Sequence, residues 1–155
     1  MHPHAALIHR FYDAFARHDG EAMAECYHAD VVFRDPVFGE LRGERARDMW
    51  RMLAAGAKDL AVAVSEVRAD DATGSARWVA SYTFGKARRR VRNDIRARFA
   101  FRDGLVVEHE DSFDLWRWSR MALGPVGILL GWTPPVQARI RHDARRQLDR
   151  FAASR

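Results

Sequence analysis

The sequence has very little cysteine and no long apolar run. A single cysteine, Cys26, cannot form a disulfide within the chain, which favours a reducing compartment. The longest apolar stretch, from Met121 to Trp132, is too short to span a bilayer. The first residues, MHPHAALIHRFYDAF, lack the charged start and the cleavage site of a signal peptide. Together these absences predict a soluble, cytoplasmic protein.

Lysine is also scarce, because 24 of the 26 basic residues are arginine, while the net charge is +5. With the many alanines, we interpret this as the composition bias of a bacterial genome rather than as a track for phosphates. The two basic clusters, 86–92 and 139–150, are not interleaved with aromatic residues, as a surface for single-stranded nucleic acid requires. We therefore expect both clusters to be solvated and predict no nucleic-acid partner.

Sequence motifs for bound groups are missing as well. The chain has no phosphate-binding glycine loop, no nucleophile elbow and no Cys-His signature. Of the seven histidines only His2 and His4 are close together, at a terminus that we expect to fray. We predict no metal site and no cofactor.

The length of 155 residues, 48% of them hydrophobic, fits one domain with a core and a cavity. Apolar residues recur with a helical period in the first third of the chain and with a period of two in its middle. The predicted helices cover 4–18, 21–27, 44–57, 114–123 and 134–152. The predicted strands cover 31–34, 60–69, 75–84, 91–101 and 105–114, and an apolar connector covers 124–131.

The turn between the last two strands decides which residues face each other. A two-residue turn at Asp103-Gly104 would pair Phe101 with Val106 and mix an apolar face with a polar one. A three-residue loop, 102–104, pairs Phe101 with Leu105 instead. We predict the three-residue loop, which also places Ile95 opposite Asp111.

Three polar residues, Asn93, His109 and Asp111, fall on an otherwise apolar strand face, and Trp78 and Tyr82 share that kind of face one strand away. A carboxylate among apolar side chains is costly unless it is paired or neutral, so this pattern favours a pocket. Alternatively, Asp111 is only a structural acceptor of hydrogen bonds.

Asp35 raises a similar question, since it ends an apolar run and precedes a proline. It is either a turn-forming acid or a functional acid at the mouth of the pocket.

Several segments in order resemble the SnoaL-like branch of the ketosteroid isomerase and nuclear transport factor 2 (NTF2) superfamily. They are FYDAF (11–15), YHAD (27–30), FRDPV (33–37), Gly43-Glu44 and FAFRDGLVVEHEDSFD (99–114). The resemblance implies an α+β, cone-shaped NTF2-like fold, with three N-terminal helices packed on a strongly curved, mostly antiparallel sheet. The resemblance covers about Leu7 to Trp116 and implies a pocket domain over 1–116 and a homodimer. A helical C-terminal extension over 117–155, which we expect to pack on the same domain, departs from the short members of the family.

The resemblance also indicates which of the family's reactions this chain has the residues for. The base of ketosteroid isomerases matches Asp35, but Phe11 and Ala97 stand where the two oxyanion donors belong, so that isomerisation needs a substitute such as Tyr12 or Tyr82. Epoxide hydrolases of this kind need an Arg-x-Asp that 75–84 lacks. In polyketide cyclases the base matches Asp111, and in scytalone-type dehydratases an inward histidine such as His109 works with an acid.

We therefore predict a pocket protein for an apolar small molecule, with Asp111, His109 and Asp35 as catalytic residues. The predicted reaction is a cofactor-free proton abstraction beside a carbonyl, leading to cyclisation, isomerisation or dehydration. The alternative is a non-catalytic binding module. The predicted substrate-binding residues are Asn93, Tyr82, Trp78, Phe11, Tyr12, Trp50 and Phe113. We expect the apolar segment from Trp116 to Trp132 to cap the mouth or to form a dimer contact, in preference to a membrane contact.

Overall fold

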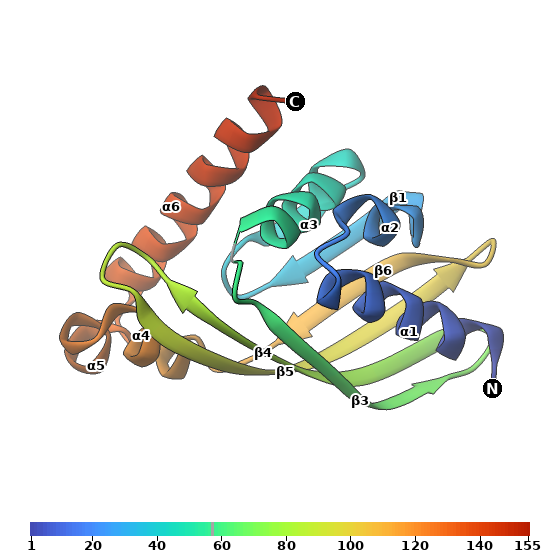
Figure 1. Ribbon diagram of the computed structural model, residues 1–155, viewed down its shortest axis with the longest axis horizontal. Helices are drawn as coiled ribbons and strands as arrows, with labels where there is room; N and C mark the ends of the chain where they lie inside the picture. The colour runs from blue at the N-terminus through green and yellow to red at the C-terminus, as the bar shows by residue number, and fades with distance from the viewer. Residues whose placement is uncertain (57) are drawn as a thin grey trace.

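One curved, open sheet of six strands forms the frame of the protein (Figure 1). The computed structural model describes residues 1–56 and 58–155. The strand order is β2-β1-β6-β5-β4-β3, and every neighbouring pair is antiparallel except β1 with β6, which is parallel. The strands are β1 (Tyr27–Asp35), β2 (Gly39–Arg42), β3 (Ala61–Ala69), β4 (Thr73–Phe84), β5 (Arg89–Arg102) and β6 (Leu105–Ser112).

Three N-terminal helices cover the inner face of this sheet, as the sequence predicted. They are α1 (Pro3–Ala16), α2 (Gly20–Glu25) and α3 (Glu44–Gly56). Pro3 opens α1, and the Asp19 carboxylate caps α2 by accepting from the Ala22 N–H at 3.0 Å. The predicted α+β, NTF2-like architecture is confirmed. The predicted end of the third helix, residue 57, lies outside the described residues.

Aromatic rings fill the interior between the helices and the sheet. Phe11 and Phe15 of α1 both meet Trp50 of α3 edge to face, with centroids 5.1 and 5.3 Å apart. The ring centroid of Trp78 in β4 lies 5.5 Å from that of Tyr12. The middle of the cone is thus a packed core, and any bound molecule must be held nearer its open end.

The predicted loop between β5 and β6 is wrong. The structure has the two-residue turn, with Asp103 at φ 56° and Gly104 at φ 75°, and Phe101 pairs with Val106. A bulge then adds one residue to β6, so that Ala100 pairs with Glu108, and Ala97 rather than Ile95 lies opposite Asp111. The bulge restores the match between apolar faces that the three-residue loop was meant to provide.

Two further elements differ from the prediction. β2 was not predicted, because Glu40 and Arg42 make this short edge strand look like a loop. The expected connector at 124–131 contains a short helix, α5 (Pro125–Leu130), between α4 (Leu115–Leu123) and α6 (Pro134–Ala153). Among the described residues, no helix is both long and apolar enough to cross a membrane.

The C-terminal helices lie against the rest of the chain at one end of the sheet. Leu148 of α6 is fully buried in the main core. Arg141 donates from Nε to the Pro36 carbonyl at 2.9 Å, and Arg145 donates to the Glu40 carbonyl at 3.2 Å. α6 therefore holds the turn that joins β1 to β2.

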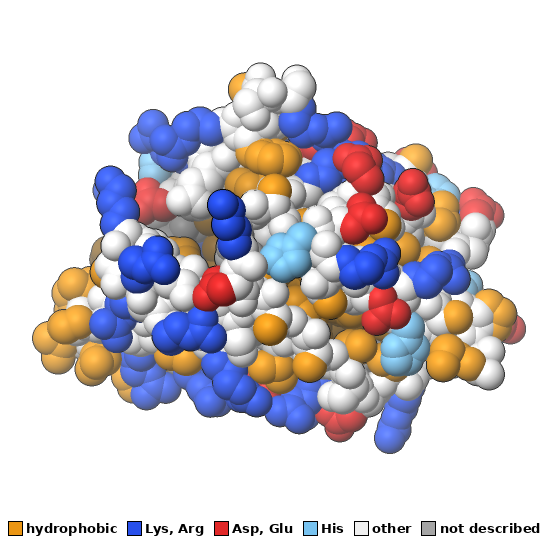
Figure 2. All heavy atoms as spheres, in the orientation of Figure 1, with side chains coloured by type: hydrophobic (Ala, Val, Ile, Leu, Met, Phe, Trp, Pro, Cys, Tyr) orange, Lys and Arg blue, Asp and Glu red, His pale blue; other side chains and the backbone are white. Residues whose placement is uncertain are grey.

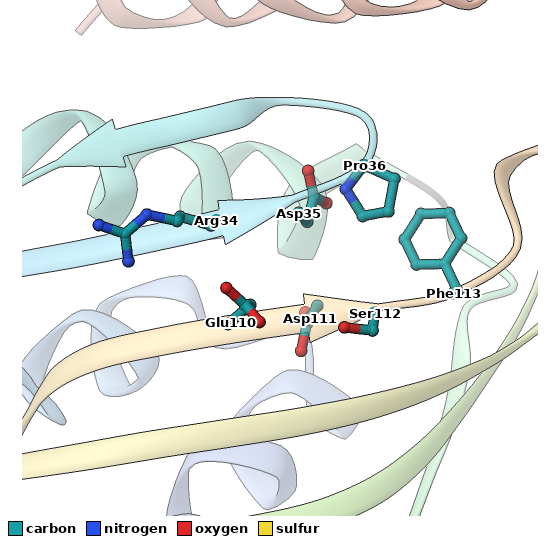
Figure 3. A pocket seen from close by; sticks show the side chains of 7 residues that line it. All are labelled: Arg34, Asp35, Pro36, Glu110, Asp111, Ser112 and Phe113. Carbon is teal, nitrogen blue, oxygen red and sulfur yellow. The ribbon is translucent and has the colours of Figure 1, made fainter.

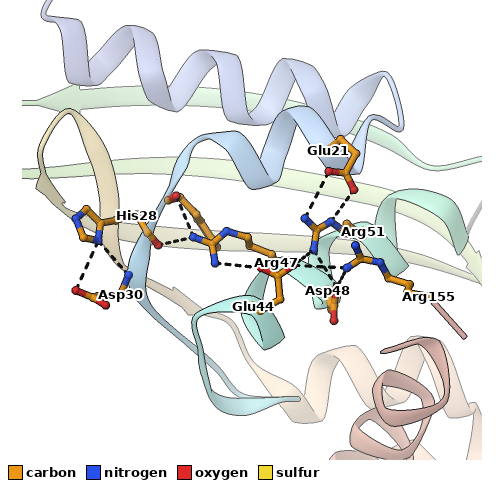
Figure 4. Close-up of polar contacts among 9 residues, drawn as sticks. Glu21, His28, Asp30, Glu44, Arg47, Asp48, Arg51 and Arg155 are labelled. Atoms are coloured by element: carbon orange, nitrogen blue, oxygen red, sulfur yellow. Dashed lines mark hydrogen bonds and ion pairs between the residues drawn. The ribbon is translucent and has the colours of Figure 1, made fainter. Parts of the chain in front are cut away.

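An ion-pair network on the outer side of α3 ties distant parts of the chain together (Figure 4). Arg51 bonds Glu21 of α2 at 2.7 Å and Asp48 at 2.9 Å, and also contacts Glu44. The bond from Arg51 lowers the pKa of Glu44. The C-terminal Arg155 pairs with Asp48, so this network connects α2, α3 and the end of α6.

Candidate functional site

A chain of buried hydrogen bonds runs from α3 to the end of β6. Trp50 Nε1 donates to Tyr27 Oη at 2.7 Å, and Tyr27 Oη lies 2.7 Å from His109 Nδ1. His109 Nε2 lies 2.8 Å from Asp111 Oδ1, which also accepts from Trp78 Nε1 at 3.3 Å. The side chains come from α3, β1, β4 and β6, and all five residues are at most 5% exposed.

The donors in this chain fix the histidine tautomer. An indole N–H only donates, so Tyr27 accepts from Trp50 and gives its own proton to His109 Nδ1. His109 therefore carries its proton on Nε2 and donates it to Asp111. Oδ1 of Asp111 thus accepts from two N–H donors. Oδ2 of Asp111 makes no hydrogen bond to the part of the chain that the structure describes.

Asp111 also lines an open pocket of about 370 Å³ at the end of β1 and β6 (Figure 3). Because these two strands run in parallel and Phe33 pairs with His109, Asp35 follows on the same inner face as Asp111. Two acids that lie 76 residues apart in the sequence thus meet at one mouth. The pocket is lined by Arg34, Asp35, Pro36, Glu110, Asp111, Ser112 and Phe113.

Asp35 forms a tight turn and also lines the pocket. Its Oδ1 accepts from the Val37 N–H at 3.0 Å and from the Phe38 N–H at 2.6 Å. Burial raises the pKa of Asp35 to about 7; the Phe38 N–H opposes this shift, while the negative charge of Asp111 adds to it. The structure thus shows the turn-forming role, while the functional role of Asp35 stays a prediction; near neutral pH the residue exists in both protonation states.

Of the predicted binding residues, Phe113 lies at the mouth, and Tyr82 and Asn93 lie on neighbouring strands without lining the pocket. Phe113 lines the pocket. Tyr82 accepts from Trp118 Nε1 of α4 at 2.8 Å, and burial raises its pKa, with a further contribution from the charge of Asp35. Asn93 is 8% exposed and pairs with Ala80 on the same inner face of the sheet.

The other predicted binding residues, Phe11, Tyr12, Trp50 and Trp78, are buried in the core, at most 5% exposed, and do not line the pocket. Tyr12 Oη is buried without a hydrogen-bond partner among the described residues. Burial raises the pKa of this phenol well above its usual value, and the charge of Asp111 adds to the shift. Its hydroxyl is therefore neutral beside the polar chain.

Sequence reasoning missed Tyr27 and Trp118. Tyr27 begins β1, 82 positions from the histidine it bonds, and only the parallel pairing of β1 with β6 brings the two together. A buried tyrosine needs a polar partner, and that was the one signal available. Among the described residues, no group of three or more His, Cys, Asp or Glu side chains is placed to hold a metal ion.

Comparison with known proteins gives one family match and many structural ones. A family model described as a SnoaL-like domain matches residues 8–109. No curated protein matches.

The structural matches include the following three solved structures. A hypothetical protein with a ketosteroid isomerase-like fold from Catenulispora acidiphila, in complex with trimethylamine, has a TM-score of 0.68 and 15% identity, over 83% of this chain and 97% of its own. An LEH-like epoxide hydrolase of M. tuberculosis has a TM-score of 0.64 and 20% identity, over 83% of this chain and 96% of its own. A candidate polyketide cyclase of Xanthomonas campestris has a TM-score of 0.64 and 19% identity, over 77% of this chain and 96% of its own. At these identities the likeness concerns the fold alone.

Proposed function

The chain belongs to the SnoaL-like domain family, and on that premise we propose that it is a cofactor-free enzyme that removes a proton beside the carbonyl of an apolar small molecule. One observation carries the proposal. Asp35 and Asp111 lie at the ends of two adjacent parallel strands and line the same open pocket. Two carboxyl groups in different environments take different roles, one as base and one as acid.

Asp111 is the base in this proposal. Hydrogen bonds from His109 and Trp78 hold Oδ1, which leaves Oδ2 to take a proton from the substrate. The electron pair of the broken C–H bond moves toward the carbonyl, and the oxygen gains negative charge. Protonated Asp35 donates a hydrogen bond to that oxygen, which fits a pKa of about 7.

The resulting enolate has three outcomes that need no cofactor. It attacks a second carbonyl of the same molecule in a cyclisation, and the new alkoxide takes the proton back from Asp111. Alternatively, it regains the proton on another carbon in an isomerisation, or it expels a neighbouring hydroxyl, which leaves as water with the proton that Asp111 had taken up. Asp35 replaces the oxyanion donors that Phe11 and Ala97 cannot supply. Phe113, at the pocket, and the nearby Tyr82 suit an apolar, aromatic substrate.

His109 is a positioning residue in this scheme. It is 1% exposed and both of its ring nitrogens are hydrogen-bonded, so it does not reach the pocket. It aims the Asp111 carboxylate and donates one proton to it. A proton on Asp111 Oδ2 weakens that donation, and the Tyr27–Trp50 bonds keep the ring in place meanwhile.

The test is exchange of carbon-bound protons, which requires no knowledge of the natural substrate. We would incubate the protein in D₂O with apolar ketones such as 2-tetralone and follow the loss of the α-proton signals by NMR. We expect exchange above the buffer rate, a loss of roughly 10²–10⁴-fold in Asp111→Asn, and a smaller loss in Asp35→Asn. Asp13→Asn, on an exposed face of α1, is the matched control and should exchange like the wild type.

Full exchange by a folded Asp111→Asn variant would overturn the assignment of the base. Binding of the ketones without any exchange in the wild type would favour the alternative, a binding module for apolar molecules. Circular dichroism of each variant separates loss of chemistry from loss of the fold.

A further inference from the structure

The α4–α5 segment exposes an unusual amount of apolar surface. Val126, Ile128 and Leu130 are 50 to 54% exposed, Trp132 is 61% exposed and Leu129 is 70% exposed. Figure 2 shows orange side chains gathered at the left end of the molecule, where Figure 1 places α5. The expectation that this segment caps the pocket mouth stays a prediction, since α4 bonds Tyr82 through Trp118 but no residue of α4 or α5 lines the pocket. We call Val126, Ile128, Leu129, Leu130 and Trp132 the apolar tip.

Glycines on the other side of α5 force this exposure. A Cβ on Gly127 would lie 1.9 Å from the Ser119 carbonyl oxygen of α4, and one on Gly131 would lie 1.9 Å from Ser119 Oγ. Trp116 Nε1 also donates to the Gly127 carbonyl at 3.2 Å. α5 therefore packs on α4 through bare backbone, and its large side chains all point away from the protein.

The surface around the apolar tip is basic, although Asp59 pairs with Arg90 at 2.7 Å and Asp143 pairs with Arg139 at 3.0 Å. From Leu115 to His142 the sequence contains four arginines and not one Asp or Glu. The hairpin from Gly85 to Asn93 adds Lys86 and four more arginines, again without an acid. This hairpin lies beside α4 and α5, because Arg89 donates to the Met121 carbonyl at 2.8 Å and its guanidinium packs against Gly124.

Charge and shape together select the partner. A second copy of the chain would bring two arginine-rich rims together with few acids between them, so the apolar tip is a poor dimer contact. Nucleic acid would match the charge but not five large apolar side chains. An anionic bilayer matches both, because arginines pair with lipid phosphates while leucine and tryptophan enter the interface. We propose that the apolar tip docks the protein on anionic membranes as a peripheral contact, independently of the function proposed for the pocket.

The experiment is co-sedimentation of the full chain with vesicles of phosphatidylcholine alone or with one quarter phosphatidylglycerol. We expect binding to the anionic vesicles at least tenfold stronger than to the neutral ones, and weakened by high salt. Leu129→Ser with Leu130→Ser should remove it. Lys86→Ser with Arg117→Ser should weaken it by on the order of tenfold or more. The control removes the same charge elsewhere, with Arg146→Ser and Arg150→Ser on the exposed side of α6.

Three results would overturn the proposal. One is no binding to anionic vesicles, and another is binding that survives the double leucine substitution. The third is a dimer in sedimentation velocity that the leucine substitutions dissociate, without any binding to vesicles. Equal loss of binding in the α6 control would show unspecific charge attraction and would also count against it.

Discussion

Asp35 combines local backbone chemistry with the chemistry of the pocket. Its Oδ1 holds the turn by accepting two backbone N–H groups, and these bonds favour the charged form. Burial outweighs them, and the pKa rises to about 7. The residue therefore stabilises the turn through its oxygen atoms but opposes folding when it carries a charge.

This conflict predicts a specific dependence of stability on pH. The folded protein releases the Asp35 proton near pH 7, whereas the unfolded chain releases it near 3.8. Between these values the folded state holds more protons, so this residue lowers stability as the pH rises and its full penalty is present above pH 7. Asp35→Asn keeps an oxygen for the turn and removes the charge. We expect it to gain on the order of 1–3 kcal/mol over the wild type at pH 8 and almost nothing at pH 4.

Urea unfolding at several pH values checks this prediction. The quantity to compare is the difference in unfolding free energy between variant and wild type, with the exposed Asp13→Asn as control. A difference that stays the same from pH 4 to pH 8 would show that Asp35 is as solvated in the protein as in the unfolded chain.

At the scale of elements, periodicity predicted most helices and strands but not the register of β5 with β6. In a regular ladder the Asp103-Gly104 turn would set an apolar strand face against a polar one, which is why the sequence favoured a three-residue loop. The protein keeps the favoured turn and inserts a bulge near Val107. No local residue type marks that bulge, so the sequence alone did not reveal it. β2 escaped notice for a related reason, since an edge strand of four residues has too few positions to show a period.

The α4–α5 contact gives a prediction at the same scale. Gly127→Ala places a Cβ 1.9 Å from the Ser119 carbonyl oxygen, so the backbone of α5 must move away from α4. We expect a loss of about 1–3 kcal/mol in unfolding free energy. Gly56→Ala, in α3, is the matched control, because nothing lies within 4 Å of its added Cβ. It should be neutral or slightly stabilising. Equal stability of the two variants would contradict the close packing of α5.

At the scale of the whole molecule, only part of the candidate site could be predicted from the sequence. Asp111 and His109 stand out because they are polar residues on an apolar strand face, and Asp35 stands out because it precedes a proline. That Asp35 and Asp111 share one pocket depends on the parallel neighbours β1 and β6, which the sequence does not disclose. The predicted aromatic binding residues were apolar and inward, as expected, but the sequence could not tell a packed core from a cavity wall.

A last question for the whole molecule is whether the C-terminal helices unfold together with the rest of the chain. Leu148 of α6 is fully buried in the same core as the three N-terminal helices, and Arg141 bonds the Pro36 carbonyl next to Asp35. We therefore predict a single unfolding transition for the chain. Leu148→Ala should lower the unfolding free energy by about 2–5 kcal/mol and leave one transition. Hydrogen exchange would show faster exchange in both α6 and the turn that carries Asp35. Early, separate melting of α6 with an unchanged Asp35 turn would mean that the pocket folds without its C-terminal helices.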